Sequence, residues 1–268
     1  MKSSFFAIEL SDAMTKEGCP ICNAIQNSTR RYMRFYLYEN VNDSFTRNSL
    51  AKSLGFCREH IQLFAKTEQE RFKTISAFNI VYEHMNREAV DRIQNWRHYY
   101  TPPSLKEKII EKLCEILKIP LCVTTLQPAK LLQGECIVCR NIKGNLVSYI
   151  KELVDFISRQ DAEMIGLYQA SNGVCLEHLQ YVFQHYQETA PQACDFLAND
   201  IGNRLSRQQQ QMQQYIRKSD WQHRFDVLSD EEVNAWRKTY AFFSGKPAAN
   251  FRARRVMDPG TENFSKEE

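Results

Sequence analysis

One pattern of cysteine and histidine occurs twice along this chain of 268 residues. In the first half, Cys19-Pro-Ile-Cys22 is followed, after 34 intervening residues, by Cys57-Arg-Glu-His60. In the second half, Cys136-Ile-Val-Cys139 is followed, after 35 intervening residues, by Cys175-Leu-Glu-His178. Two unrelated copies at nearly equal spacing are very improbable, so the pattern indicates a tandem internal duplication.

The residue types in this pattern predict a metal site in each half. Three thiolates and one imidazole form a common ligand set of tetrahedral structural zinc. A Cys-x-x-Cys turn with a downstream Cys-x-x-His favours metal binding over disulfides in a chain with no export signal. We expect two structural zinc ions, with Cys19, Cys22, Cys57 and His60 as one ligand group and Cys136, Cys139, Cys175 and His178 as the other.

Other roles for these cysteines are weaker. The same ligand set can hold an iron–sulfur cluster, and the sequence does not separate that alternative from zinc. Cys19-Pro-Ile-Cys22 also resembles the motif of thiol–disulfide oxidoreductases, but no βαβ pattern surrounds it. The three remaining cysteines lie in apolar stretches and are expected to be buried thiols: Cys114, Cys122 and Cys194.

The periodicity predicts a mainly α-helical fold of two tandem pseudo-symmetric helical modules. The best boundary is Thr101-Pro-Pro103, which gives a first module over 1–101 and a second over 102–245. Residues 246–268 are rich in proline, glycine and charge and are predicted to be a disordered tail. Two short apolar runs, 5–10 and 121–126, are interpreted as strands that pair in a small ribbon.

Local signals place several helix boundaries. Asp43-Ser44 is expected to cap a helix that ends at Gly55, and Ser229 begins a capping box with Glu232. Cys57 and Cys175 are expected at the starts of helices, with their histidines on the same face three residues later. Further helices are expected over 22–40, 69–98, 104–119, 140–157 and 191–217, with another ending at Asn172-Gly173.

Composition excludes some classes of protein. The chain is 43% hydrophobic and 25% charged with a net charge of +3, which is typical of a globular protein and not of a dedicated nucleic-acid binder. No run approaches the ~20 apolar residues of a membrane span, and the start lacks the apolar stretch of a signal peptide. We expect a cytoplasmic protein without a membrane partner.

One segment could contact nucleic acid. Arg30–Tyr36 interleaves arginines with aromatic residues, which can grip a phosphate backbone and stack on bases. An amphipathic helix with a buried aromatic face explains the same segment and is favoured. No phosphate-binding loop, nucleophile elbow or His-Glu-x-x-His motif occurs, so the catalytic residues, if any, are unknown.

The whole pattern resembles a family of uncharacterised bacterial proteins, of clostridial type, known only as a domain of unknown function. The resemblance spans about residues 5–245. Besides the two ligand patterns, it is carried by Ile8–Met14, Gly55, Gly173, Trp221–Phe225, Trp236-Arg237 and Gly245. It implies no activity.

The sequence therefore favours a non-catalytic, zinc-stabilised helical protein that binds a protein or peptide partner. Closed four-ligand sites leave no position for a substrate. An iron–sulfur protein in electron transfer or redox sensing is the first alternative, and a nucleic-acid-binding regulator is the second.

Overall fold

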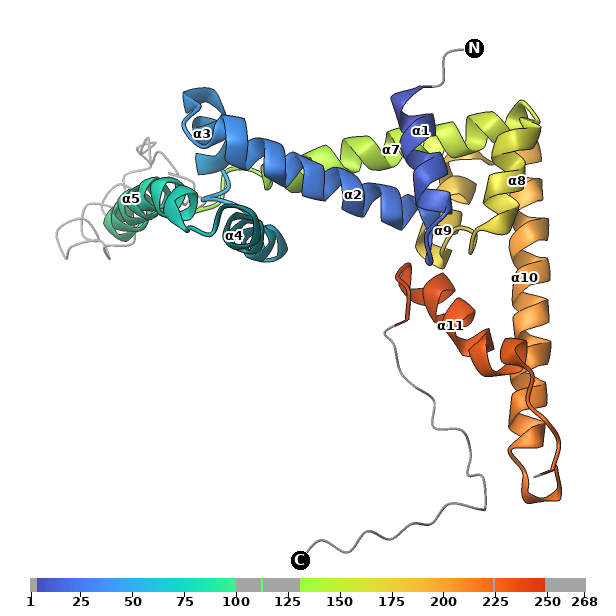
Figure 1. Ribbon diagram of the computed structural model, residues 1–268. Coiled ribbons are helices and arrows are strands. Elements are labelled where there is room, and N and C mark those ends of the chain that lie inside the picture. The colour runs from blue at the N-terminus through green and yellow to red at the C-terminus, as the bar shows by residue number, and fades with distance from the viewer. Residues whose placement is uncertain (1–3, 100–111, 113–130, 224, 249–268) are drawn as a thin grey trace, which may run out of the picture. The chain divides into compact units, whose positions relative to one another are not determined.

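The computed structural model describes residues 4–99, 112, 131–223 and 225–248 (Figure 1). Every regular element in these ranges is a helix. The chain forms two compact units, and each is described by itself. Unit 1 contains residues 1–28 and 144–268, and unit 2 contains residues 29–143. The expected modules, 1–101 and 102–245, divide the chain differently, because unit 1 joins the beginning of the chain to its second half.

Unit 1 is built around a core to which most of its helices contribute. Leu10, Ile21, Leu153 and Leu197 are each no more than 1% exposed within one cluster. Its helices are α1 (Phe5–Met14), the beginning of α2 (Pro20–Phe35), most of α7 (Ile137–Ser158), α8 (Ala162–Ala170), α9 (Leu176–Tyr186), α10 (Pro191–Lys218), the short η2 (Trp221–His223) and α11 (Asp230–Ser244).

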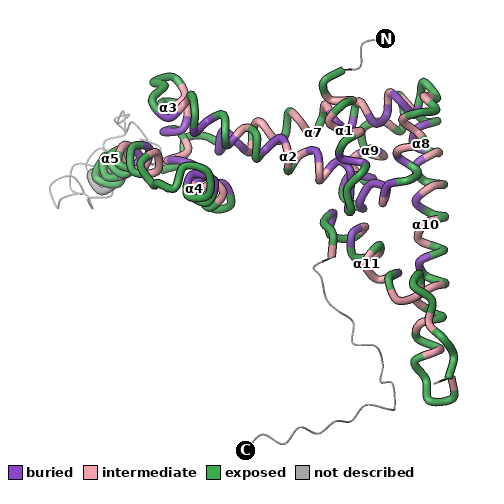
Figure 2. The backbone as a smooth tube through the Cα atoms, viewed as in Figure 1, coloured by how far each residue is buried: buried purple, intermediate pink, exposed green. Residues whose placement is uncertain are grey.

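The C-terminal helices of unit 1 form a hairpin that extends beyond the core. Burial in α10 is concentrated in its first turns, since after Ile201 only Gln208 is buried (Figure 2). Ser229 and Glu232 form the capping box that the sequence predicts at the start of α11. Lys218 ties the two helices together, because its Nζ lies 2.8 Å from Oε1 of Glu232.

Unit 2 has its own core, in which aromatic rings are prominent. Tyr36, Phe56 and Phe64 contact one another with ring centroids 5.1 to 5.7 Å apart. The buried carboxylate of Glu68 accepts hydrogen bonds from the backbone N–H groups of residues 77 and 78, which fixes the start of the next helix. The helices are the remainder of α2, the π-helical η1 (Tyr36–Asn40), α3 (Ser44–Ala51), α4 (Arg58–Phe72), α5 (Ser76–Tyr99) and the beginning of α7.

The predicted ribbon is not supported. Residues 5–10, expected as a strand, lie in α1, where Ser4 caps the helix by accepting a hydrogen bond from the N–H of Ala7. Leu10 and Met14, four residues apart, are both buried, so the apolar run follows a helical rather than an alternating period. The partner segment, 121–126, lies outside the described residues, as do all but one residue of the expected helix 104–119 and most of the tail.

Within the described residues, the predicted helices agree with the structure to within a few residues except at one junction. Asp43 caps α3, and Cys57 and Cys175 are the N-cap residues of α4 and α9. The long helix expected over 69–98 is interrupted, because α4 ends at Phe72 and Lys73 adopts a left-handed conformation with φ of 55°. The pseudo-symmetry of the two halves stays a prediction.

Candidate metal centres

Eight cysteine and histidine side chains form two compact clusters. The first, called site A, consists of Cys19, Cys22, Cys175 and His178, and one ligand atom from each lies within 4.8 Å of the others. Nδ1 of His178 lies 3.4, 3.5 and 3.1 Å from the sulfurs of Cys19, Cys22 and Cys175, in that order. The sulfurs of Cys22 and Cys175 are 3.9 Å apart.

The second cluster, called site B, consists of Cys57, His60, Cys136 and Cys139 under the same 4.8 Å limit. Nδ1 of His60 lies 3.1, 3.8 and 3.4 Å from the sulfurs of Cys57, Cys136 and Cys139, in that order. The sulfurs of Cys57 and Cys139 are 3.6 Å apart. Site A lies in unit 1 and site B in unit 2.

These separations fit one tetrahedral ion per cluster. Around zinc, with Zn–S about 2.3 Å and Zn–N about 2.0–2.1 Å, two sulfurs lie about 3.8 Å apart and a sulfur and a nitrogen about 3.6 Å apart. In the structure, the sulfur–sulfur distances are 3.6 and 3.9 Å, and the sulfur–nitrogen distances run from 3.1 to 3.8 Å. A single ion can therefore contact all four ligand atoms in either cluster.

Each cluster is assembled from the beginnings of two helices. At site A, Cys175 is the N-cap of α9, and the carbonyl of Cys19 accepts the first hydrogen bond of α2 from Asn23. Site B repeats this with Cys57 at α4 and the carbonyl of Cys136 at α7. A helix N-terminus carries partial positive charge, which stabilises a nearby thiolate. The N-cap cysteines make no side-chain capping hydrogen bond, so both sulfurs are available to a metal.

A glycine with positive φ precedes the N-cap cysteine of each site and packs closely against a neighbouring helix. Gly55 and Gly173, two residues before the N-cap cysteines, have φ of 101° and 75°. A Cβ at Gly173 would lie 2.9 Å from Ile201, and one at Gly55 would lie 2.9 Å from Tyr82.

Sequence reasoning missed the contribution of Gly245 to site A. Gly245 ends α11 with φ of 71°, and a Cβ there would lie 2.6 Å from the sulfur of Cys22 and 3.5 Å from that of Cys175. The end of α11 thus covers this side of the cluster. The available signal was a glycine directly after a capped helix, which marks a helix end but not what lies beneath it.

The expected grouping of the ligands is wrong, although the eight residues are the expected ones. Each cluster combines the Cys-x-x-Cys of one half with the Cys-x-x-His of the other. Cys19 and Cys22 meet Cys175 and His178 rather than the pair at 57 and 60. The two copies carry the same donor atoms. Their spacing therefore predicts the ligand residues but not which Cys-x-x-Cys pairs with which Cys-x-x-His.

The two sites differ in exposure. At site A only Cys22 is partly exposed, whereas at site B both Cys57 and Cys139 are. Burial, together with the neighbouring thiol of Cys57, raises the pKa of Cys139 to about 12. Without a cation, this thiol therefore holds its proton at neutral pH. A divalent ion would supply the charge that lets several thiolates coexist.

The pKa of the histidine of site A is also shifted by its burial and by the neighbouring thiols. Burial disfavours its charged form, but hydrogen bonds to Cys175 and Cys19 outweigh burial and raise the pKa of His178 to about 10. A metal replaces this proton when it binds Nδ1. Glu59 and Glu177, which directly precede the two histidines in the sequence, are exposed, whereas both histidines are buried.

Other residues singled out in the sequence lie outside the clusters. Cys194 is buried, as expected of a structural thiol, whereas Cys114 and Cys122 lie outside the described residues. In the Arg30–Tyr36 segment, Met33 and Tyr36 are fully buried while Arg30 and Arg34 are exposed. This agrees with the amphipathic helix favoured from the sequence, except that the aromatic ring of Phe35 is exposed.

Fold and sites together define a helical protein with two clusters of three cysteines and one histidine. The model of a family of unknown function (DUF6062) matches residues 1–241, and the chain belongs to this family. Searches of the curated proteins and of the solved structures returned no significant match. Across the described residues, no helix combines the length and apolar character needed to cross a membrane.

Proposed function

We propose that this protein binds two structural zinc ions, one at site A and one at site B, and serves as an interaction module for a protein or peptide partner. The observation that carries the proposal is the convergence of four protein ligand atoms within 4.8 Å in each cluster. A tetrahedral ion held by four protein ligands has no open position for water or substrate, which is the hallmark of a structural site.

The ligand spacing favours a single ion over an iron–sulfur cluster. In a cluster with several irons, the thiolates bind different metal atoms and are held farther apart than around one ion. Sulfur–sulfur distances of 3.6 and 3.9 Å correspond to ligands of the same ion. Thiolate and imidazole donors in tetrahedral geometry are the preferred set for zinc.

Zinc at these positions would act as a cross-link within each unit. Site A joins segments 153 residues apart, and site B joins segments 82 residues apart. Structural zinc contributes apparent binding free energies of about 10–16 kcal/mol. Whole domains are stable by only about 5–15 kcal/mol, so each unit is expected to depend on its ion.

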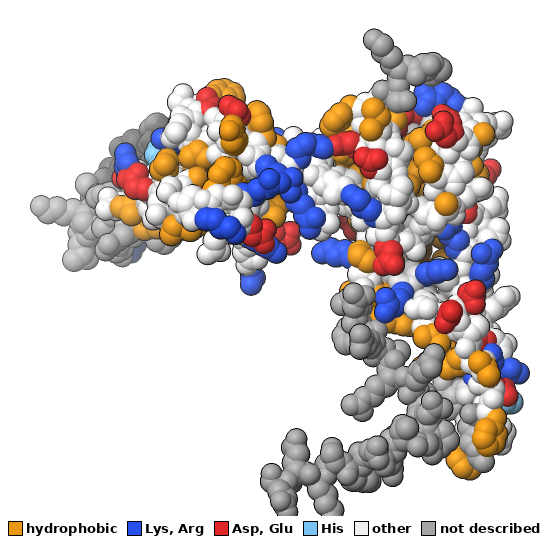
Figure 3. All heavy atoms as spheres, in the orientation of Figure 1, with side chains coloured by type: hydrophobic (Ala, Val, Ile, Leu, Met, Phe, Trp, Pro, Cys, Tyr) orange, Lys and Arg blue, Asp and Glu red, His pale blue; other side chains and the backbone are white. Residues whose placement is uncertain are grey.

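The surface of the α10–α11 hairpin supports a role in binding partners. Around its turn, Ile216, Trp221 and Val227 are 68%, 74% and 85% exposed. Hydrophobic side chains are visible at this end of the hairpin in Figure 3. Large apolar side chains that gather on a surface are typical of sites where another protein binds.

Metal analysis tests the first half of the proposal. Protein purified without oxygen is analysed for zinc, iron and sulfide, and its absorbance spectrum is recorded. Two zinc atoms per chain and no visible absorbance support structural zinc. Iron with inorganic sulfide and absorbance near 400 nm would overturn it in favour of a redox role.

Partner binding is tested with a surface variant that leaves the metal sites intact. A protein captured by the wild type is purified and its affinity is measured directly. Ile216→Ser with Val227→Ser is expected to weaken that affinity while keeping two zinc atoms. An unchanged affinity would remove the hairpin from the interaction surface.

A further inference from the structure

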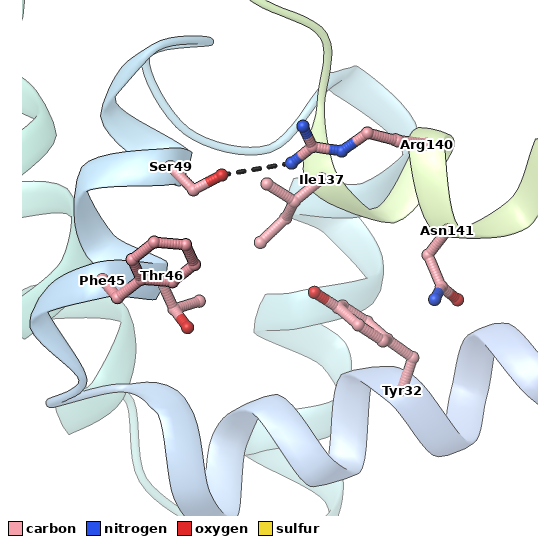
Figure 4. A pocket seen from close by; sticks show the side chains of 7 residues that line it. All are labelled: Tyr32, Phe45, Thr46, Ser49, Ile137, Arg140 and Asn141. Carbon is pink, nitrogen blue, oxygen red and sulfur yellow. Dashed lines mark hydrogen bonds between the residues drawn. The ribbon is translucent and has the colours of Figure 1, made fainter.

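Unit 2 contains a pocket that none of the metal ligands lines. It has a volume of about 320 Å³ and lies among three helices, α2, α3 and α7 (Figure 4). We call it the Arg140 pocket. Its lining residues are Tyr32, Phe45, Thr46, Ser49, Ile137, Arg140 and Asn141. The volume is at the lower end of the range of about 300–1,000 Å³ for small-molecule sites.

Site B determines the position of the pocket floor. Ile137 is only 5% exposed and lies between Cys136 and Cys139, two ligands of site B. Arg140 directly follows Cys139 in the first turn of α7. A metal ion in site B would therefore hold both the apolar floor and the cation of the pocket in place.

Most N–H donors of the Arg140 guanidinium are not engaged by the described residues. One of its nitrogens donates to Oγ of Ser49 at 3.1 Å, and among the described residues no carboxylate lies within ion-pair distance of it. Arg204 in unit 1 differs, since it binds the carboxylate of Asp200 and three backbone carbonyls. A guanidinium offers five N–H donors, so most of those on Arg140 face the pocket or water.

The rest of the pocket combines apolar surface with neutral polar groups. Figure 4 shows Tyr32, Phe45 and Arg140 arranged around Ile137. The Phe45 ring is 81% exposed, so an apolar ligand body resting against it would remove that ring surface from water. The Tyr32 hydroxyl lies on the lining and can donate a hydrogen bond.

We propose that the Arg140 pocket binds a carboxylate attached to an apolar body. The guanidinium of Arg140 pairs with the carboxylate, because its planar fork of N–H groups suits the two carboxylate oxygens. Phe45 and Ile137 cover the apolar part of the ligand. A single charge matches better than a phosphate dianion, because the pocket has one cation and the carboxylate of Asp43 caps α3 beside Thr46. Such a group occurs in free apolar acids and at the C-terminus of a peptide.

The inference rests on the proposed function only through the filled site B, so zinc content is measured before every titration. The zinc-loaded full chain is titrated with N-acetyl-L-phenylalanine and with its neutral amide, and backbone amide shifts are followed by NMR. We expect saturable shifts near Ser49 and Asn141, with the acid binding at least tenfold more tightly than the amide.

Matched variants test which residues bind the acid. Arg140→Gln is expected to lower its affinity about tenfold, Arg140→Lys less, and Phe45→Ala several-fold. Arg87→Gln removes the same charge from the exposed surface of α5 in unit 2 and is expected to leave the affinity unchanged. Equal weakening by Arg140→Gln and Arg87→Gln would overturn the proposal, since it would indicate general charge attraction.

A further arm distinguishes the source of the carboxylate. Hexapeptides ending in phenylalanine are compared as free acid and as C-terminal amide. Tighter binding of the peptide acid than of N-acetyl-L-phenylalanine would identify a peptide C-terminus, and equal or weaker binding would identify a small acid. Two retained zinc atoms with no saturable shift by any probe would refute the pocket while leaving the metal sites intact; absent zinc would instead refute the proposed function.

Discussion

The crossed assembly of the metal sites can be tested by counting zinc in paired variants. Cys19→Ser with Cys175→Ser removes two ligands from site A and leaves site B complete. Cys19→Ser with Cys57→Ser removes one ligand from each site. Both variants lose two cysteines, so they differ only in whether the lost ligands belong to the same cluster.

The structure determines the expected counts. The Cys19/Cys175 variant should retain one zinc atom after a challenge with chelator, because site B lies within the separate core of unit 2. The Cys19/Cys57 variant should retain none, because a site with three ligands holds zinc far less tightly than one with four. If each half formed its own site, the two results would be exchanged.

The stability of each unit should change together with the number of zinc atoms retained. Treated as a cross-link between residues 22 and 175, site A closes a loop of 153 residues, and chain entropy alone then contributes about 5 kcal/mol. The Cys19/Cys175 variant should therefore lose the unfolding transition of unit 1 and keep that of unit 2. Elemental analysis after desalting, with circular dichroism on the same samples, measures both. One zinc atom in the Cys19/Cys57 variant and none in the other would refute the crossed assembly.

Three further predictions concern the glycine beside site A, the ion pair of the α10–α11 hairpin and the removal of both metal ions. Gly245→Ala forces a side chain into a left-handed conformation 2.6 Å from the sulfur of Cys22 and should cost about 1–2 kcal/mol or more in denaturant unfolding, with faster zinc loss from site A. The control Gly202→Ala, in α10 with open space around it, should instead gain about 0.5–1 kcal/mol. The hydrogen bond from Lys218 lowers the pKa of Glu232, so its contribution to stability is present above about pH 4.3 and lost as the pH falls through the lower folded value. Unfolding midpoints of the wild type and Glu232→Gln should thus differ near neutral pH and converge in acid. Removing both zinc ions by chelation should abolish most of the helical circular dichroism, and adding zinc should restore it; helices that persist without metal would contradict the structural role.

Local structure was largely readable from the sequence, because its causes lie within a few residues. The capping box at Ser229, the cap at Asp43 and the placement of Cys57 and Cys175 at helix starts are all confirmed. The error at residues 5–10 has a local cause as well: a run of six residues, five of them apolar, fits either a strand or a helix, and burial of Leu10 in the core of unit 1 selects the helix.

The sequence by itself determined the eight side chains of the candidate metal sites, because donor types and their three-residue spacing carry that information. Only the tertiary structure decided which Cys-x-x-Cys meets which Cys-x-x-His. Both copies offer the same ligands, and the chain entropy of closing a loop of 35 residues differs from that of 153 by only about 1 kcal/mol. The choice therefore depends on packing, in which the beginnings of α2 and α9 share one core and those of α4 and α7 share the other.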